Sequence, residues 1–273
     1  MKVGIWFYGL GAALTGILDI AWRAFDASHQ PIRALGNVPG QNILACVAGV
    51  WLIAAGLAIL APRRAQLGAA ACGAAYLFFV ALWLVRYPAG IHALGWRIDV
   101  LLGISFGLGQ QLLLVAPAVM VFLASTDSLS QARATTAARW MLGLPPIVFG
   151  LLHIVGMHVF ASIVPRWIPF ANFWAVFTGA AFLLSGAAIC SGIQDVLAAR
   201  LLAVMLLLFE VLVEVPPIFS RVHNQATWGA AVYNVAAIGA YWIFAEFRAR
   251  RAVQIRIDSP GNVAIPRPDA AVA

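Results

Sequence analysis

Eight long apolar stretches, almost free of charge, limit what this chain can fold into. They cover residues 4–24, 41–61, 66–86, 99–123, 139–161, 171–191, 198–218 and 227–247. A run of roughly 18 or more mostly apolar residues is long enough for a helix to cross a lipid bilayer. Charged residues make up 10% of the chain, against about 25% in a typical soluble domain. The sequence therefore predicts an all-α integral membrane protein with eight transmembrane helices.

The basic residues predict how these helices are oriented. If the N-terminus is inside, 11 of the 17 Lys and Arg residues fall on cytoplasmic segments and the other 6 on the opposite side. Cytoplasmic segments of membrane proteins are enriched in Lys and Arg, so both termini are predicted to be cytoplasmic, in a bacterial-type inner membrane. The net charge of +7 then needs no nucleic acid partner, and no basic stripe interleaved with aromatic residues is present.

The chain also contains an internal repeat. The segment "GILDIAW" (16–22) is similar to "GLLHIVG" (150–156) at an offset of 134, and residues 41–60 are similar to 171–190 at an offset of 130. The sequence therefore predicts two parallel four-helix repeats, 1–123 and 139–250, joined by a cytoplasmic linker at 124–138 and followed by a disordered cytoplasmic tail at 251–273. Close helix approach is expected at six glycines: Gly49, Gly56, Gly103, Gly107, Gly179 and Gly186.

Two carboxylates interrupt the seventh stretch, in "LLLFEVLVEVPP" (207–218). Glu210 is expected about 15 Å along the helix axis, near the middle of the bilayer. Glu214 follows one turn later on the same helix face, just before Pro216 and Pro217, which are expected to end the helix. Ionisable groups in membrane helices are costly and commonly mark functional sites. Two ionised carboxylates this close repel each other, so at least one is expected to be protonated unless a cation lies nearby.

The repeat supplies partners for these carboxylates. It aligns Glu214 with Arg86, which could form an ion pair across the central axis, either functional or purely structural. It also aligns Asp19 with His153, and Asp19 could instead pair with Arg23 one turn away. His153 could relay protons to a glutamate or be a satisfied core histidine. No helical metal-binding motif is present, so no metal is expected. The candidate catalytic residues are Glu210, His153, Glu214 and Asp19, and the candidate ligand-binding residues are Arg86, Arg23, His158, Trp174, Asn172 and Asn42.

Most of these polar residues fall in the outer half of the predicted membrane, which predicts an outward-facing polar cavity. In the inner half, Gln110 and Gln111 are the strongest polar candidates, and two amides are too few for an ion pathway. Nine residues of the outer loops are expected to be solvated: Asp26, His29, Arg33, His92, Arg97, Asp99, Arg166, Arg221 and His223.

The second repeat resembles the DoxX-like family of small four-helix membrane proteins. The resemblance lies in Gly150 and His153, in "VPRWIP" (164–169), and in "TGAAFLLSG" (178–186). It covers residues 149–189 well, and it reaches the first half through the internal repeat. It implies a four-helix fold for each half and, for some relatives, an association with redox enzymes, including oxidation of thiosulfate with a quinone as acceptor.

Three functions fit these observations. The first is a DoxX-like multi-pass membrane protein whose outward-facing cavity binds a small or lipidic molecule, as a quinone-linked redox subunit beside a redox partner protein. The second is a membrane-embedded acid–base enzyme, of isomerase, cyclase or hydrolase type, acting on an apolar isoprenoid, sterol or lipid substrate. The third is a proton-coupled transporter. No sequence motif requires a cofactor, and a quinone is the one that the resemblance implies.

Overall fold

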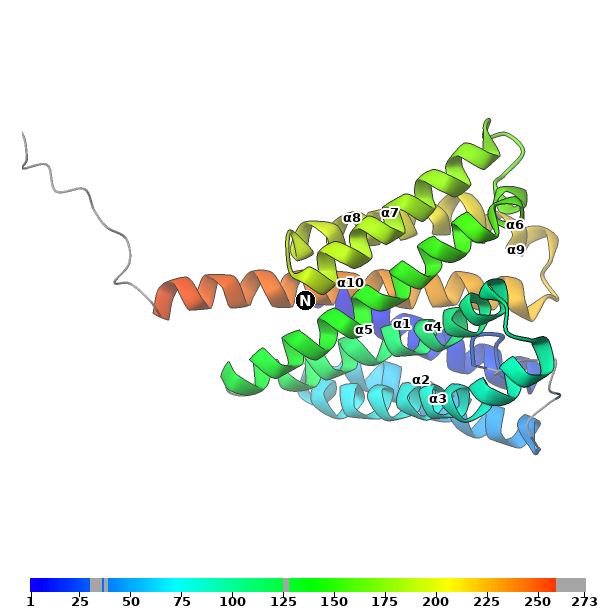
Figure 1. Cartoon of the computed structure of the whole chain (residues 1–273). Coiled ribbons are helices and arrows are strands. Elements are labelled where there is room, and N and C mark those ends of the chain that lie inside the picture. Colours follow the sequence, from blue (N-terminus) through cyan, green and yellow to red (C-terminus); the bar gives the residue numbers. More distant parts are fainter. Residues whose placement is uncertain (30–35, 37–38, 125–127, 259–273) are drawn as a thin grey trace, which may run out of the picture.

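The computed structural model describes residues 1–29, 36, 39–124 and 128–258 (Figure 1). This part of the chain is helical throughout, without β-strands. The long helices are α1 (Lys2–Trp22), α2 (Gln41–Leu60), α3 (Ala65–Leu94), α4 (Ile98–Leu123), α5 (Ser128–Val155), α7 (Ala171–Ser191), α8 (Asp195–Phe209) and α10 (Gln225–Asp258). The short ones are the 3-10 turn η2 (Pro62–Arg64), α6 (Met157–Ile163), the π-helical turn η3 (Glu210–Glu214) and α9 (Val215–Ser220).

The described residues contain eight helical segments that are long and apolar enough to cross a membrane. The prediction of an all-α, multi-pass membrane protein is therefore confirmed. Two helices extend beyond the expected boundaries. Helix α5 already begins at Ser128, so most of the expected linker is helical, and α10 continues through 251 to Asp258. These polar segments are rich in Ala, Arg and Gln, which favour helix. Residues 259–273 of the expected tail lie outside the described part.

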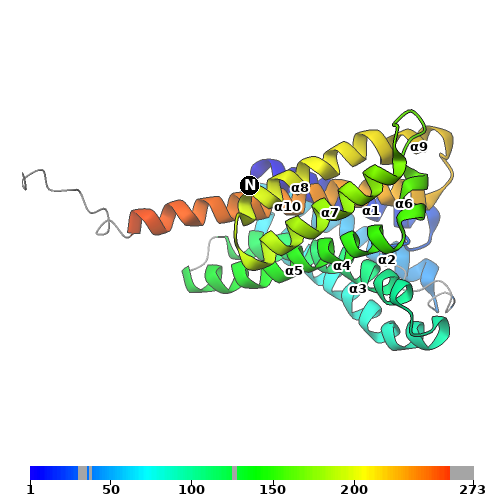
Figure 2. The same cartoon turned by 45° about the horizontal axis from the view of Figure 1, so that its top comes forward.

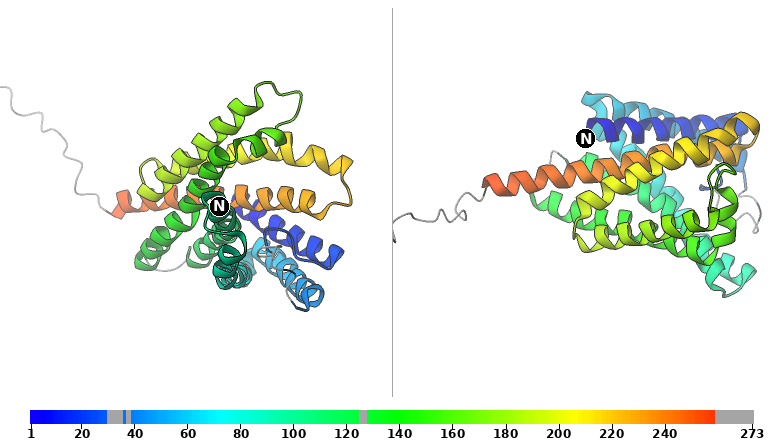
Figure 3. Two further views of the ribbon diagram at one scale, coloured as in Figure 1. Left: turned by 45° about the vertical axis from the view of Figure 1, so that its right-hand side comes forward. Right: turned by 90° about the horizontal axis from the view of Figure 1, so that it is seen from above.

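The long helices form a closed ring (Figures 1 and 3). Each packs against the next in the order α1, α2, α3, α4, α5, α7, α8, α10 and back to α1, and α4 also packs against α10 across the middle. The amino group of Met1 contacts Glu246 of α10, so the start of α1 lies beside the last part of α10. We call this end of the bundle proximal. The opposite end, which carries α6 and α9, is called distal (Figure 2).

Glycines let two helix pairs approach until their backbones touch. At the α1–α2 crossing, a Cβ atom on Gly49 would lie 2.6 Å from the carbonyl oxygen of Gly16. At the α5–α7 crossing, a Cβ on Gly150 would lie 2.5 Å from the carbonyl oxygen of Gly179. No side chain larger than hydrogen fits at these separations. Both helix pairs can therefore pack closely because the sequence places glycine at the two facing positions.

The other expected glycine contacts are mostly present. Gly56 packs against Gly9, Gly186 against Gly143, and Gly107 against the ring of Trp83. Gly103 was a wrong prediction, because a Cβ there would meet no atom within 4 Å.

A charged cluster ties three helices together at the proximal end. The carboxylate of Asp195, at the start of α8, accepts hydrogen bonds from Nε of Arg248 at 2.7 Å and from Nη2 of Arg139 at 3.3 Å. Asp195 is buried, while both arginines are partly exposed. This cluster joins α8 to α10 and α5.

Candidate functional site

A cavity of about 520 Å³ opens among α4, α5, α6, α7, α8 and α10. Its walls are largely aromatic and aliphatic, and Phe106, Phe149, Phe160, Trp174, Phe177, Phe182 and Phe209 all contribute. Polar side chains are few: Gln110, His153, Thr178, Glu214, Tyr233, Asn234 and Tyr241. We call it the distal cavity, because α6 and the loop from Val164 to Ile168 border it.

His153 is held in the wall of the distal cavity by two contacts. Its Nδ1 lies 2.7 Å from the carbonyl oxygen of Phe149, one turn earlier in α5. Its ring stacks on Phe160 of α6, with ring centroids 3.7 Å apart. Because a carbonyl can only accept, Nδ1 carries the proton in this bond, and Nε2 of the neutral ring is left as a hydrogen-bond acceptor.

The two glutamates flank the π-helical turn η3. The backbone N–H of Val215 donates to the carbonyl of Glu210, five residues earlier. Pro216 and Pro217 were expected to end this helix. The chain instead continues as α9, with the prolines in its first turn, and the whole segment Asp195–Ser220 is long enough to span. Proline lacks an N–H group but suits the first turn of a helix, and the wide turn before it interrupts the α-helical bonding. Such π-turns occur frequently at functional sites.

The structure separates the predicted site residues. His153, Glu214 and Trp174 line the distal cavity, and the Trp174 indole donates to the carbonyl of Pro169 at 3.1 Å. Glu210 is half-buried and is not among the described residues that line the cavity; its Oε2 is enclosed by protein without a hydrogen-bond partner. Four other predicted residues are exposed: Arg23, His158, Asn42 and Asn172.

Arg86 and Glu214 do not form an ion pair within the described part of the chain. The guanidinium of Arg86 donates instead to the carbonyl oxygen of Gly36, at 3.2 Å. Helices α4 and α10 meet in the middle of the ring, whereas α3 and α8 lie on opposite sides of it (Figures 1 and 3). Equal depth in aligned helices therefore does not bring these two side chains together.

Asp19 belongs to a second polar cluster, which sequence reasoning missed. Asp26 and His29 were expected to be solvated, yet their relative exposures are 4% and 1%. Asp19 Oδ1 accepts a hydrogen bond from the backbone N–H of Asp26 at 3.0 Å, and Asp19 Oδ2 lies 3.4 Å from His29 Nδ1. Arg23 is exposed and does not take part.

The other expected loop residues that the structure describes are exposed or partly exposed: His92, Arg97, Asp99, Arg166, Arg221 and His223. Arg33 lies outside the described residues.

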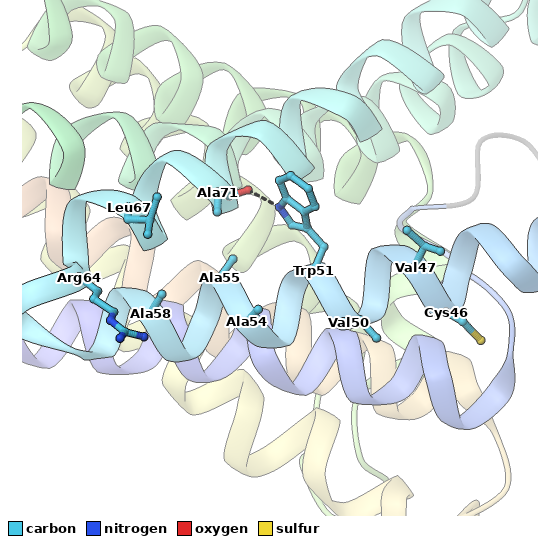
Figure 4. Close-up of a pocket in the computed structure, with 10 residues that line it drawn as sticks. All are labelled: Cys46, Val47, Val50, Trp51, Ala54, Ala55, Ala58, Arg64, Leu67 and Ala71. Atoms are coloured by element: carbon cyan, nitrogen blue, oxygen red, sulfur yellow. Dashed lines mark hydrogen bonds between the residues drawn. The ribbon is translucent and has the colours of Figure 1, made fainter.

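A second hollow, of about 720 Å³, runs along the outer face of the bundle between α2 and α3 (Figure 4). Its lining is aliphatic apart from Cys46, from Arg64, and from Trp51, whose indole donates to the carbonyl of Ala71 at 2.9 Å. Val47 and Val50 on its edge are 61% and 62% exposed. An apolar groove on the outside of a membrane-spanning bundle faces lipid. The distal cavity, which combines enclosed apolar volume with converging polar groups, is the stronger candidate for a specific site.

The chemistry of the distal cavity follows from its free polar groups. Within the described residues, the buried hydroxyl of Tyr233 has no hydrogen-bond partner, and His153 has one ring nitrogen to offer. No group of three or more His, Cys, Asp and Glu side chains there could hold a metal ion. The arrangement suits an apolar molecule with a small polar head. No protein-family model, curated protein or solved structure matches the chain, so the site is interpreted from its own residues.

Proposed function

We propose that this protein binds one small lipidic molecule, with a ring and an apolar chain, in the distal cavity of a membrane-spanning bundle. The single observation that carries the proposal is the cavity itself. Its volume of about 520 Å³ lies within the range of roughly 300–1,000 Å³ that ligand pockets occupy. The rings of its walls suit a planar apolar group, because aromatic pairs add attraction to the burial of area.

Tyr233 favours a ligand that accepts a hydrogen bond, whereas Nε2 of His153 favours one that donates. Tyr233 lines the cavity, but its hydroxyl is enclosed by protein, so it can donate to an accepting ligand only when the ring shifts toward the cavity. An unpaired buried hydroxyl is costly until it does so. A quinone has a planar ring, two carbonyl acceptors and an isoprenoid chain, so it is the ligand class to test first. In that role the protein would be a quinone-linked membrane subunit beside a redox partner protein.

A duplicated, DoxX-like architecture is part of the proposal. The neighbours of α1, α2, α3 and α4 correspond to those of α5, α7, α8 and α10, and α4 against α10 is the shared central pair. The crossing glycines correspond too, since Gly16 and Gly49 align with Gly150 and Gly179 at the offsets of the sequence repeat.

The residues of the DoxX-like resemblance converge on one place in the fold. Gly150 forms the α5–α7 crossing, and the distal cavity is bordered by His153, by Val164 and Pro165 of the "VPRWIP" segment, and by Thr178. A family resemblance concentrated in the wall of a cavity supports a role for that cavity.

We also propose an orientation and a location from the basic residues. Among the described residues, the proximal end carries the N-terminus, the last turns of α10 and most of the Lys and Arg side chains, so we assign it to the cytoplasm of a bacterial-type inner membrane. The distal cavity then lies toward the outer face.

Binding is tested with a decyl-substituted benzoquinone added to the purified protein in detergent. We expect one bound molecule by native mass spectrometry and quenching of Trp174, which lines the cavity. The Tyr233→Phe variant should bind about tenfold more weakly, while its stability stays equal or rises because an unpaired hydroxyl is gone. The matched control is Tyr87→Phe, which removes a 2.9 Å bond to Ser105 between α3 and α4, away from the cavity. Equal affinity of both variants and the unaltered protein would contradict this site.

Catalysis and transport remain the competing functions, and the same preparation separates them. His153 and Glu214, which both line the cavity, could act as base and acid. An enzyme would convert an isoprenoid or sterol substrate, and Glu214→Gln would abolish turnover while binding persists. A carrier would move the bound molecule across proteoliposomes. A binding subunit does neither.

A further inference from the structure

The loop after α1 turns back into the bundle instead of lying on its surface. We call residues Arg23–His29 the inserted loop. Within it, Phe25 and His29 are each 1% exposed, and Asp26 and Ser28 are also buried. Loops normally run over the surface, because their backbone polar groups need water. A loop that is buried must therefore find its partners inside the protein.

The inserted loop holds its shape through an internal turn. Oδ1 of Asp26 accepts hydrogen bonds from the backbone N–H of Ser28 at 2.9 Å and from its hydroxyl at 2.7 Å. The Asp26 backbone is in turn fixed to Asp19 of α1. This turn presents the Ser28 carbonyl and the His29 ring to the helices around it.

Side chains of the surrounding helices contact the inserted loop as the walls of a binding site contact a ligand. The Ser28 carbonyl accepts two hydrogen bonds, from Nε1 of Trp83 on α3 and from Nε2 of Gln111 on α4, both at 2.9 Å. The His29 ring stacks flat on Phe79 of α3, with centroids 4.0 Å apart and planes within 3°. A carbonyl held by two donors and a ring laid on an aromatic face are contacts that a ligand with a ring and an acceptor would make, and the distal cavity likewise has aromatic walls with a few polar side chains.

The position of the inserted loop corresponds to that of the distal cavity in the other half. The loop lies among α1, α3 and α4, and Asp26 packs against Gly229 of α10. The duplication maps these helices onto α5, α8, α10 and α4, all of which line the cavity. It also maps Asp19, which binds the loop, onto His153, which lines the cavity.

We propose that the inserted loop is a built-in occupant of the first half's ligand site, so that the chain keeps one open site and one that it fills itself. This inference rests on the proposed duplication and ligand-binding role. The filled site would accept the same class of molecule as the open one, a planar ring with a hydrogen-bond acceptor. The ring would stack on Phe79, and the acceptor would receive hydrogen bonds from Trp83 and Gln111.

The packing around the inserted loop leaves polar atoms unpaired, unlike that of a core built for stability. Five buried polar atoms around it form no hydrogen bond in the described part of the chain: Asp26 Oδ2, Tyr76 Oη, Gln111 Oε1, and the pair Asp19 Oδ2 and His29 Nδ1, which lie 3.4 Å apart. A core built for stability leaves few such atoms. Their concentration here fits a former binding site better than a packed interior.

The test removes the occupant and leaves its receptor intact. The triple variant Phe25→Ala, Asp26→Ala, His29→Ala deletes both rings and the turn, while Ala27→Ser, at an exposed position of the same loop, is the control. The probe is the decyl-substituted benzoquinone, counted by native mass spectrometry. We expect the triple variant to bind one more molecule than the unaltered protein and the control.

A second variant tests the receptor. Trp83→Phe with Gln111→Leu removes both donors, so it should loosen the loop without creating a second site. Loosening is measured on the buried thiol of Cys72, which lies one turn from Tyr76 on α3, in a background with Cys46→Ala and Cys190→Ala. We expect thiol labelling to be at least tenfold faster in both variants than in the control.

The outcomes distinguish this inference from the proposed function. If the unaltered protein binds no probe and the triple variant binds one, the inference that the inserted loop fills a site is supported, and the proposed ligand binding in the distal cavity is contradicted. If both proteins bind one probe molecule, the proposed function is supported, and the inference that the inserted loop fills a second site is contradicted. An unchanged rate of Cys72 labelling in both variants also contradicts the inference about the loop. If the triple variant does not fold, the labelling rate is measured on the single variant His29→Ala instead.

Discussion

We expect alanine at Gly16 or at Gly150 to destabilise the bundle by about 2–3 kcal/mol, the cost of overpacking a rigid contact. The added methyl group would press on the backbone carbonyl of Gly49 or of Gly179. Backbone atoms in the middle of a helix cannot rotate away as a side chain can. The helices must therefore move apart, and the packing along both crossings is lost.

Gly103→Ala is the matched control, because a methyl group there meets no atom within 4 Å. Alanine favours helix over glycine by about 1 kcal/mol, so this variant should be as stable as the unaltered protein or slightly more so. The free energy of unfolding is measured by titration with SDS in mild detergent. Equal losses at all three positions would show that the close crossings at Gly16 and Gly150 are not the cause, because Gly103 has no atom within reach of the added methyl group.

The spans were predictable because they depend on local properties. Length and hydropathy decide whether a helix can cross a bilayer, and the described residues form eight helical segments that meet both conditions. The same holds for most of the glycine contacts, which the repeat identified by aligning Gly49 with Gly179 and Gly56 with Gly186. Small residues at repeated positions predict close helix packing, and this prediction does not require knowing how the eight helices are arranged.

The site was predicted in part, and the errors have physical causes. The i, i+4 spacing of Glu210 and Glu214 assumes a regular helix, whereas the turn between them is π-helical. Pairing Arg86 with Glu214 assumes that aligned positions face each other, which holds only for the helices at the centre of the ring. Here the centre is formed by α4 and α10.

The inserted loop could not be predicted from its own residues. Asp26, Ser28 and His29 are typical of exposed turns, and their burial depends on Trp83 and Gln111, which lie 55 and 83 residues away. Polar walls of the distal cavity were also missed, although Tyr233, Asn234 and Tyr241 lie on one apolar helix. An asparagine within an apolar span is a usable signal.

We expect Asp195→Ala to be among the most destabilising single changes at the proximal end, at about 2–3 kcal/mol, because it removes hydrogen bonds to a charged group while the two arginines stay partly exposed to solvent. Asp195 is the only described carboxylate that Arg139 and Arg248 contact. Its loss leaves two guanidinium groups close together, with no counter-charge to hold α5 and α10 against α8. Asp195→Asn, which keeps an acceptor oxygen but not the charge, should cost less.

Asp99→Ala is the matched control for this prediction, because it also removes a carboxylate from an arginine. Asp99 pairs with Arg97 at 2.6 Å, but the side chains are 45% and 69% exposed, and an exposed pair is worth at most about 1 kcal/mol. Unfolding by SDS should therefore shift strongly for Asp195→Ala and barely for Asp99→Ala. The Asp195 pairs should also resist added salt, since ions screen buried charges less than exposed ones. A similar loss of stability in both variants, abolished by salt, would show that the cluster contributes only surface electrostatics. It would then not hold the three helices together.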